Sequence, residues 1–373
     1  MESLDDLLAR YDGAAPLEEA STLPAPYYLD PRVFERERAT TFSRNWQLVA
    51  RADQLAAPGR YVTAEVAGEP IVVVRGADGV LRAFFNVCRH HAAAVMTEPE
   101  GSAPHLRCPY HGWTYALDGA LRGTPDFAGV CKFDKGATGL VPIDVDEWEG
   151  LVLVRLERGG PGFRDAVGAD LVAQVAALGL GAMTFVERRR YVLDCNWKVY
   201  VDNYLDGGYH VPHLHRALDS ALDYKSYTIE SGARHVLQSS PVIASASPDV
   251  AAVRGGDRAM YYWFHPNLMI NWYAGIMDVN AVHPLAVDRT EVVFDFYFTD
   301  VSSPGASERN RASMELGQRI QDEDVAICAS VQRGLRSRAY DAGRLSVRRE
   351  AGEHCFHRLL AAELTRSRPS APP

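Results

Sequence analysis

Two short runs of metal-binding residue types constrain the fold of this chain more than any other feature. Cys88 and His90 form a C-x-H pattern, and Cys108 and His111 form a C-x-x-H pattern, with seventeen residues between His90 and Cys108. Zinc accepts two thiolates and two imidazoles. A two-iron, two-sulfur cluster accepts them too, with both thiolates on one iron and both imidazoles on the other. Because each run supplies one Cys and one His, each can reach both irons, which favours the cluster over a zinc finger.

The residues around these ligands resemble the Rieske cluster motif. Asn86 precedes the first run, and Gly112-Trp113-Thr114-Tyr115 closes the second. The neighbouring His91 and the more distant His105 are expected to be exposed loop residues. The resemblance implies a [2Fe-2S] cluster bound by Cys88, His90, Cys108 and His111.

Composition and charge place the chain among globular proteins. Of its 373 residues, 47% are hydrophobic, and the formal net charge of −9 argues against nucleic acid as a partner. No run approaches the roughly 18 apolar residues of a membrane-spanning helix, so we expect a cytoplasmic protein that does not bind membranes. The basic run Arg188–Arg190 is expected to be a solvated face or a docking patch. The remaining cysteines are expected to be small buried hydrophobic residues: Cys131, Cys195, Cys328 and Cys355.

The pattern along the chain predicts an α+β protein with a lead-in and two domains. Residues 1–45 are expected to be helical and to pack on the second domain, with a helix that starts at Pro31 after Asp30 as N-cap. Residues 46–157 are expected to form a small all-β domain that carries both cluster loops, with strands at 61–66, 71–74, 82–86 and 151–154. A Gly/Pro-rich boundary follows. Residues 158–373 are expected to form an antiparallel sheet flanked by helices, with a strand at 184–193, a helix at 196–205, strands between 230 and 299, a long helix at 307–335 and a disordered tail at 367–373.

A second group of potential ligands lies between residues 203 and 215. His210, His213 and His215 fall within ten residues together with Asp206. Two imidazoles and one carboxylate on one face of iron(II) leave positions open for dioxygen and substrate. The third ligand must then come from elsewhere in the chain.

The long predicted helix offers that ligand. Asp324 lies on an apolar stripe of this helix, and a carboxylate that faces a core is unfavourable unless it is paired or binds a metal. Asp322 and Glu323 point off the stripe and are expected to be solvated. The stripe consists of Ile320, Ile327, Cys328, Val331 and Leu335.

Together, the two ligand sets resemble the catalytic (alpha) subunit of the Rieske non-haem iron oxygenases. The resemblance covers the chain from about Trp46 to Leu335. It implies a helix-grip-like catalytic domain that binds mononuclear iron through His210, His215 and Asp324. His213 competes for one of the two histidine positions, because the proline at 212 makes spacing arguments less secure.

The same resemblance implies a homotrimer in which a carboxylate bridges a cluster histidine and an iron histidine across the subunit boundary. Asp206 is the candidate for this bridge. It lies four residues before His210, whereas many relatives have three, so Asp202 is the alternative.

The implied reaction is the oxygenation of a small organic substrate with electrons from a separate NAD(P)H-dependent reductase of the flavin or ferredoxin type. The chain shows neither a complete nucleotide-binding glycine pattern nor plant-type ferredoxin spacing. Residues 203–212 resemble the branch that contains choline monooxygenase, which implies a quaternary ammonium substrate such as choline or a betaine. The alternative is an aromatic-ring hydroxylating dioxygenase or an O- or N-demethylase. An electron carrier or a structural metal protein is a distant alternative, disfavoured by the second ligand set.

A group of aromatic residues in the middle of the predicted strand region supports two interpretations. They can enclose a trimethylammonium group by cation–π attraction, or they can pack the core of the sheet. Successive strand residues face opposite sides, so at most half of them can face one pocket. The group comprises Tyr261, Tyr262, Trp263, Trp272 and Tyr273.

Overall fold

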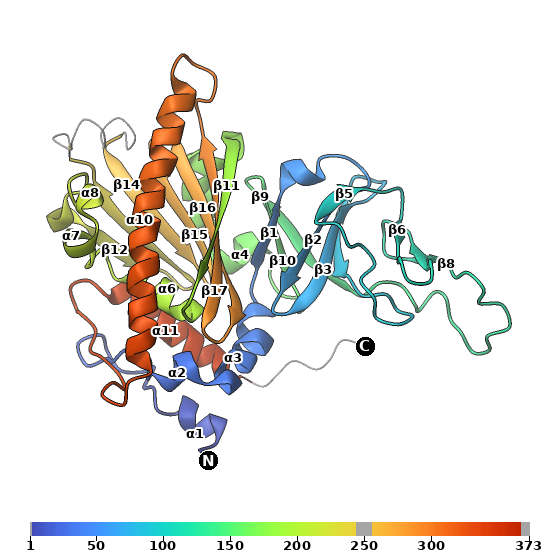
Figure 1. The fold of residues 1–373 in the computed structure, drawn as a ribbon, viewed down its shortest axis with the longest axis horizontal. Helices are drawn as coiled ribbons and strands as arrows, with labels where there is room; N and C mark the ends of the chain where they lie inside the picture. Colours follow the sequence, from blue (N-terminus) through green and yellow to red (C-terminus); the bar gives the residue numbers. More distant parts are fainter. Residues whose placement is uncertain (1, 244–255, 367–373) are drawn as a thin grey trace. The chain divides into compact units, whose positions relative to one another are not determined.

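The structure is a computed structural model that describes residues 2–243 and 256–366 (Figure 1). The chain divides into two compact units. The smaller unit is Arg38–Ala166, and the larger unit combines residues 2–37 with residues 167–366. The domain boundaries expected after residues 45 and 157 stay predictions, and the tail predicted at 367–373 lies outside the described residues.

The smaller unit is built from antiparallel strands. Its main sheet has the order β1-β10-β9-β4-β3-β2-β5, and a second sheet has the order β6-β7-β8. The main strands are β1 (Gln47–Arg51), β2 (Arg60–Val66), β3 (Glu69–Arg75), β4 (Leu81–Phe85), β5 (Glu100–Ser102), β9 (Pro142–Trp148) and β10 (Leu151–Arg155). The short ones are β6 (Leu106–Arg107), β7 (Thr114–Tyr115) and β8 (Leu121–Gly123). The π-helical turn η1 (Arg38–Phe42), the 3-10 turn η2 (Ala52–Leu55) and α4 (Phe163–Val167) complete the unit's elements, with Val167 itself already in the larger unit.

Strand β3 explains how this sheet carries the cluster loops. Its residues Ile71–Val74 are fully buried, and alternate side chains of a strand point to opposite faces. Val72 and Val74 join the hydrophobic cluster that contains Cys88 and Cys108. The intervening residues of the same strand join a separate cluster around β10. Buried apolar packing on both faces therefore gives the two cluster loops a rigid base.

The larger unit contains a seven-stranded antiparallel sheet with the order β11-β17-β16-β15-β14-β13-β12. Its strands are β11 (Thr184–Leu193), β12 (Thr228–Ser231), β13 (His235–Pro241), β14 (Arg258–Phe264), β15 (Leu268–Tyr273), β16 (Ile276–Ala286) and β17 (Arg289–Phe298). Its helices are α1 (Leu4–Leu8), α2 (Pro26–Leu29), α3 (Pro31–Glu37), α5 (Ala169–Ala177), α6 (Trp197–Leu205), α7 (Val211–Leu214), α8 (Arg216–Asp219), α10 (Ala306–Leu335) and α11 (Ala351–Leu364), with 3-10 turns η3 (Leu180–Ala182) and η4 (Tyr224–Ser226). These elements confirm the predicted α+β class with an antiparallel sheet flanked by helices.

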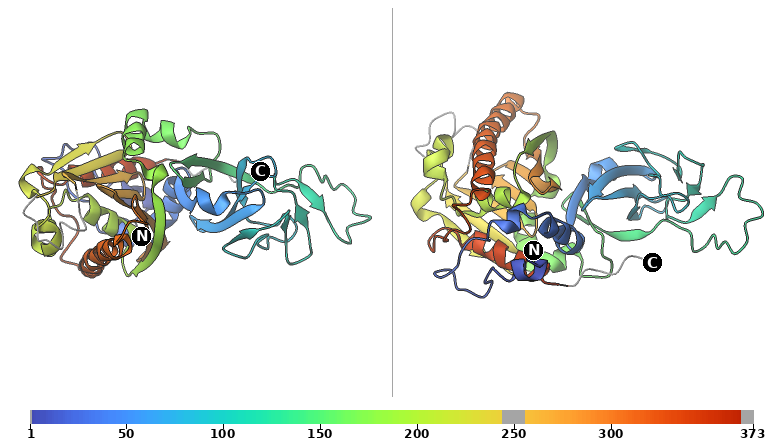
Figure 2. Two further views of the ribbon diagram at one scale, coloured as in Figure 1. Left: turned by 90° about the horizontal axis from the view of Figure 1, so that it is seen from above. Right: turned by 60° about the horizontal axis from the view of Figure 1, so that its bottom comes forward.

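Helices cover both faces of this sheet. Helix α6 contacts α10, α11 and strand β16, whereas α5 lies on the opposite side of the sheet from α10 (Figure 2). The Asn196 side chain caps α6 by accepting a hydrogen bond from the Lys198 backbone N–H, as expected of an N-cap residue. Within the described residues, no helix is both long enough and apolar enough to cross a membrane.

A buried ion pair ties the lead-in to this helical layer. Lys198 Nζ lies 2.6 Å from Glu37 Oε1, and both side chains are fully buried. The indole N–H of Trp197 donates to the other Glu37 oxygen at 2.8 Å. Removing one partner of such a pair leaves an unpaired buried charge, so the pair fixes α3 against α6.

Two sequence predictions about surface chemistry hold only in part, since Arg190 is exposed and Cys195 and Cys328 are buried as predicted. The arginines at 188–190 are not a free patch, because Arg188 pairs at 2.6 Å with the buried Asp295 and its two neighbours also pair with carboxylates of β11 and β17. Among the remaining cysteines, Cys131 is exposed and Cys355 is half-buried. Cross-strand pairing and loop position, which local composition does not encode, account for both differences.

Candidate active site

The cluster loops bring the four predicted ligands together in like pairs. Cys88 and Cys108 are buried, and burial together with the neighbouring Cys88 thiol raises the pKa of Cys108. The rings of His90 and His111 lie with their centroids 4.7 Å apart. Thiol beside thiol and imidazole beside imidazole is the arrangement that a cluster with one Cys-bound and one His-bound iron requires.

The surroundings of His90 fit a metal ligand. Its ring stacks on Trp113 with a centroid distance of 4.7 Å. Its Nδ1 atom is buried and has no hydrogen-bond partner among the described residues, and a buried polar atom without a partner needs an explanation such as a bound ion. His91 and His105 are exposed, as predicted. The residues present therefore fit a two-iron cluster.

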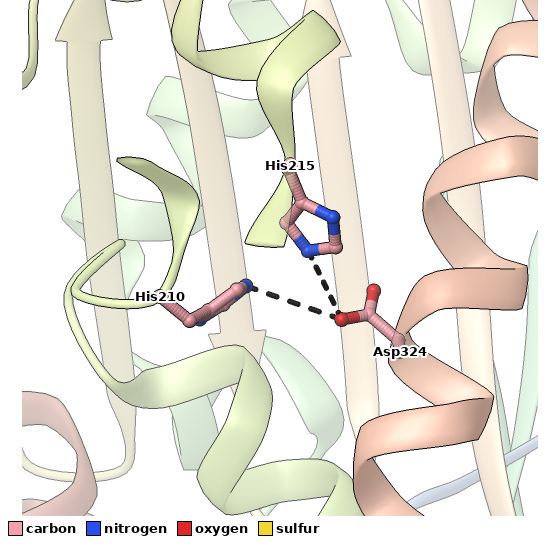
Figure 3. Close-up of side chains that lie close together, drawn as sticks. All are labelled: His210, His215 and Asp324. Carbon is pink, nitrogen blue, oxygen red and sulfur yellow. Dashed lines mark hydrogen bonds and ion pairs between the residues drawn. The ribbon is translucent and has the colours of Figure 1, made fainter. Parts of the chain in front are cut away.

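The second ligand set converges in the larger unit. His210 and His215 flank α7, and Asp324 projects from the middle of α10 (Figure 3). His215 Nε2 lies 3.1 Å from Asp324 Oδ1, and His210 Nε2 lies 4.0 Å from the same oxygen. One ligand atom from each residue lies within 4.8 Å of the others. This donor set of two imidazoles and one carboxylate fits iron(II) bound on one face.

A carboxylate also contacts the Nδ1 atom of each of the two histidines. Asp206 Oδ2 lies 2.5 Å from His210 Nδ1, and Glu323 Oε2 lies 2.6 Å from His215 Nδ1. Burial alone lowers the pKa of His215, but Asp324 and Glu323 outweigh it and raise the pKa. A carboxylate on Nδ1 keeps the proton there and leaves Nε2 for a metal.

The prediction that Glu323 is merely solvated is therefore wrong. Its neighbour on the chain, Asp324, contacts the other nitrogen of the same histidine. A second carboxylate directly beside a candidate ligand was the sequence signal that could have identified it. Glu323 lies off the apolar stripe, and apolar periodicity identifies only the buried side of a helix.

The structure gives different surroundings to Asp206, to its alternative Asp202, and to His213, the alternative iron ligand. Asp206 accepts hydrogen bonds from the backbone N–H groups of Tyr209 and His210, at 3.1 and 3.0 Å. Asp202 instead binds the Tyr28 hydroxyl at 2.6 Å and the His357 ring at 2.9 Å. His213 is exposed and does not join the His210–His215–Asp324 group.

The predicted apolar stripe on α10 is only partly buried. Cys328 and Leu335 are buried, but Ile327 and Val331 are 38% and 44% exposed. The prediction is wrong for these two residues, because the helix presents them to a shallow surface hollow. That hollow is also lined by Asp202, Asp206 and Glu353.

A cavity of about 110 Å³ opens beside the three ligands. Tyr261 and Tyr273 line it, and their hydroxyl groups lie 2.8 Å apart. Trp263 packs instead against Phe356 of α11, and Tyr262 stacks with Phe264. Alternation puts Tyr262 on the other face of β14 from Tyr261. Trp263 shares the face of Tyr261 but lies further along the strand, in the core against α11. The cavity wall also includes Tyr200, Tyr204, Tyr227, Gln238, Asn271, Asp278, Asn280, Phe294, Phe296, Ile320 and Gln321.

A small β-domain with paired Cys and His ligands, and a helix-flanked sheet with a two-histidine, one-carboxylate site, define the class of Rieske non-haem iron oxygenases. Two family models agree with this assignment. Residues 45–134 match the Rieske [2Fe-2S] domain, and residues 180–366 match the ring hydroxylating alpha subunit (catalytic domain). The chain belongs to the ring-hydroxylating alpha-subunit family of Rieske oxygenases, and is an oxidoreductase with a [2Fe-2S] domain and a catalytic domain that binds mononuclear iron.

The chain is similar to particular members of this family, in sequence and in structure. The chain is 37% identical over 370 residues to a chloroplastic choline monooxygenase of Arabidopsis thaliana, covering 96% of this chain and 87% of that one. It is 33% identical to the carnitine monooxygenase oxygenase subunit of Escherichia coli strain K12, covering 92% and 94% of the two chains. A solved quaternary ammonium Rieske monooxygenase, CntA with its substrate L-carnitine, superposes with a TM-score of 0.81 at 28% identity, covering 98% of this chain and 100% of that one.

Proposed function

We propose that this protein oxygenates a quaternary ammonium compound, with choline and betaines as the candidates. The observation that carries the proposal is the tyrosine-lined cavity that opens directly beside His210, His215 and Asp324. Aromatic faces attract quaternary ammonium groups. The names of the choline and carnitine monooxygenases to which the chain is similar support the same substrate class.

We assign roles to the residues as follows. Cys88, His90, Cys108 and His111 hold the cluster. His210, His215 and Asp324 hold the mononuclear iron, which when bound supplies reductive activation of dioxygen. Asp206 orients His210, and in the assembled enzyme it also links that ring to a cluster histidine of a neighbouring subunit.

The proposed assembly is a homotrimer that receives electrons from a separate NAD(P)H-dependent reductase of the flavin or ferredoxin type. A solved relative at 28% identity is described as transferring electrons between subunits, which supports such an assembly here. We propose that both proteins work in a compartment that supplies NAD(P)H, with the cytoplasm as the candidate.

Aromatic-ring hydroxylation is the less favoured reaction for this cavity. Its wall carries the buried polar side chains Gln238, Asp278 and Asn280. An aromatic hydrocarbon would leave the amide oxygens of Gln238 and Asn280, which have no hydrogen-bond partner among the described residues, unsatisfied in a buried site. A substrate with a hydroxyl group can donate a hydrogen bond to such an oxygen.

The test is a screen of reductant-dependent product formation with choline, glycine betaine, carnitine, and methoxylated and simple aromatic compounds. We expect oxygen uptake and product in equal amounts with at least one quaternary ammonium compound. Turnover confined to the aromatic compounds would overturn the proposed substrate class. Turnover of no compound by protein loaded with cluster and iron would overturn the proposed activity.

A further inference from the structure

Resting on the proposed function, we infer that Asp278 is the anionic partner of the substrate's ammonium group and makes the cavity selective for a quaternary ammonium alcohol over a carboxylated betaine. Asp278 lies on β16 and is 5% exposed. It lines the same cavity as the tyrosines and the three ligand residues. Its carboxylate therefore belongs to the cavity wall together with the aromatic rings that attract an ammonium group.

The sheet register places Asp278 in the middle of the cavity wall. Directly opposed residues of antiparallel neighbours share one face of a sheet. Asp278 stands opposite Asn271 on one side and Phe296 on the other. The same row continues from Asn271 to Tyr261 and then to Gln238. Five strands thus present one continuous row of cavity residues, with the carboxylate between an amide and an aromatic ring.

Neighbouring side chains hold this carboxylate in place. Asn271 Nδ2 donates to Asp278 Oδ2 at 2.7 Å, and the Tyr204 hydroxyl donates to Asn271 Oδ1 at 2.8 Å. Burial, followed by the charge of Asp278, raises the pKa of Tyr204 well above its usual range. The Tyr204–Asn271–Asp278 chain fixes the direction of the carboxylate and places its charge beside a cavity tyrosine.

The charges around the cavity favour a cation and disfavour a carboxylate. Among the described residues that line it, the acidic ones are Asp278 and Asp324, and none is Lys or Arg. The guanidinium of Arg189 lies over the ring of Phe296, a lining residue, at 5.6 Å from the ring centroid, and it is paired with Glu187 at 2.6 Å.

Carboxylates also dominate the immediate surroundings of the iron site. Asp206 and Glu323 contact its histidines and Asp324 belongs to it, so three negative charges outweigh the two positive charges of iron(II). Among the described residues of the wall a substrate carboxylate would find no cationic side chain, whereas an ammonium group would find Asp278.

The uncharged end of the substrate also has candidate partners. Asn280 Oδ1 and Gln238 Oε1 are buried and have no hydrogen-bond partner among the described residues. Both side chains line the cavity. An alcohol hydroxyl can donate to such an amide oxygen. A carboxylate can only accept hydrogen bonds, so it cannot satisfy these two oxygens.

The test is to measure the affinity of each probe for the holoenzyme by calorimetry. The cluster is oxidised and oxygen is excluded, so that no substrate is turned over during the measurement. The probes are choline, glycine betaine, L-carnitine and dimethylbutanol, the neutral carbon isostere of choline. We expect choline to bind at least about tenfold more tightly than either betaine or the neutral isostere. Loss of a desolvated charge pair commonly has at least this effect.

The variant Asp278→Asn keeps the size of the side chain and an oxygen for Asn271. We expect it to bind choline about tenfold more weakly while its affinity for glycine betaine is unchanged or higher. The exposed Glu230→Gln serves as the control variant, with unchanged affinities.

Equal binding of choline and glycine betaine by the wild type would overturn the inference and leave the proposed function intact. Binding of none of the quaternary ammonium probes would overturn the proposed substrate class as well. If Asp278→Asn does not fold, the wild-type comparison of the four probes still decides the question.

Discussion

Glu323 and His215 form a hydrogen bond of 2.6 Å between Oε2 and Nδ1, although 108 positions separate them in the chain. The next residue of the same helix, Asp324, lies 3.1 Å from the other nitrogen of that ring. Consecutive residues of α10 therefore contact both nitrogens of one imidazole. One carboxylate is placed to bind iron, and the other fixes the orientation of the histidine that binds it.

We predict that Glu323→Gln weakens binding of the mononuclear iron about 10- to 100-fold, the usual effect of losing an outer partner of a ligating histidine. The visible spectrum of the cluster should not change. The measurement is iron retention against a competing chelator. Asp322→Asn is the matched control, because Asp322 contacts only Gln318 in the described structure, at 2.8 Å. Equal iron retention by Glu323→Gln and the wild type would show that Glu323 is not needed to position the ring.

Replacing an iron ligand should have a larger effect than replacing Glu323. His215→Ala and Asp324→Ala should each abolish turnover and leave the cluster spectrum intact, because a site with one ligand missing holds iron poorly. His213→Ala should keep substantial activity, since His213 is exposed. Loss of iron from His213→Ala together with retention in His215→Ala would reverse the ligand assignment.

The cluster ligands can be tested by colour and metal content. Purified protein should be brown and hold three irons per chain, two in the cluster and one mononuclear. Replacing His90 or Cys108 with Ala should remove the visible absorption of the cluster. His91→Ala is the control, because His91 adjoins His90 but is exposed. A normal spectrum in both ligand variants, or only two irons in fully active protein, would contradict the assignment.

Electron transfer should depend on Asp206. Asp206→Asn should keep three irons per chain and the proposed homotrimer, but it loses the charge that holds His210. Reoxidation of a pre-reduced cluster in a single turnover should slow at least about tenfold, within the range for outer partners of metal ligands. Asp202→Asn should behave like the wild type in this assay, because Asp202 contacts Tyr28 and His357 instead. A defect in Asp202→Asn without one in Asp206→Asn would move the role to Asp202.

The stability of the protein in acid should depend on Glu363, a buried carboxylate of α11. Burial alone raises the pKa of Glu363, but His265 and Arg234, each 2.9 Å away, outweigh it and lower the pKa to about 2 from its usual 4.5. Because this pKa is lowered on folding, the contribution to stability is present above pH 4.5 and is lost as the pH falls towards about 2.

Glu363→Gln should therefore lower the free energy of unfolding by about 3 kcal/mol at neutral pH. The difference from the wild type should shrink steadily as the pH falls from about 4.5 to about 2. Melting temperatures of both proteins across this range provide the measurement, with the exposed Glu230→Gln as the control. A difference that does not change with pH would mean that ionisation of Glu363 is not the source of its effect.

The sequence by itself determined the features that depend on neighbouring residues. The C-x-H and C-x-x-H runs, the spacing of His210 and His215, and the start of α6 after Asn196 are all local signals. Strand β11 and helix α10 likewise lie where periodicity predicts them, at Thr184–Leu193 and Ala306–Leu335. Such features are set by backbone preferences and capping within a few residues, so a single sequence contains them.

The tertiary structure alone decided which distant residues meet. The Glu323–His215 contact, the Asp278 row across five strands and the exposure of Ile327 and Val331 each depend on how a helix is rotated or how strands are registered. A shift of one residue in strand register moves a side chain to the opposite face of the sheet. Register and helix rotation are fixed by packing among segments far apart in the chain. The sequence therefore offered Asp206 as a partner of His210, but it missed Glu323 and left the composition of the cavity wall open.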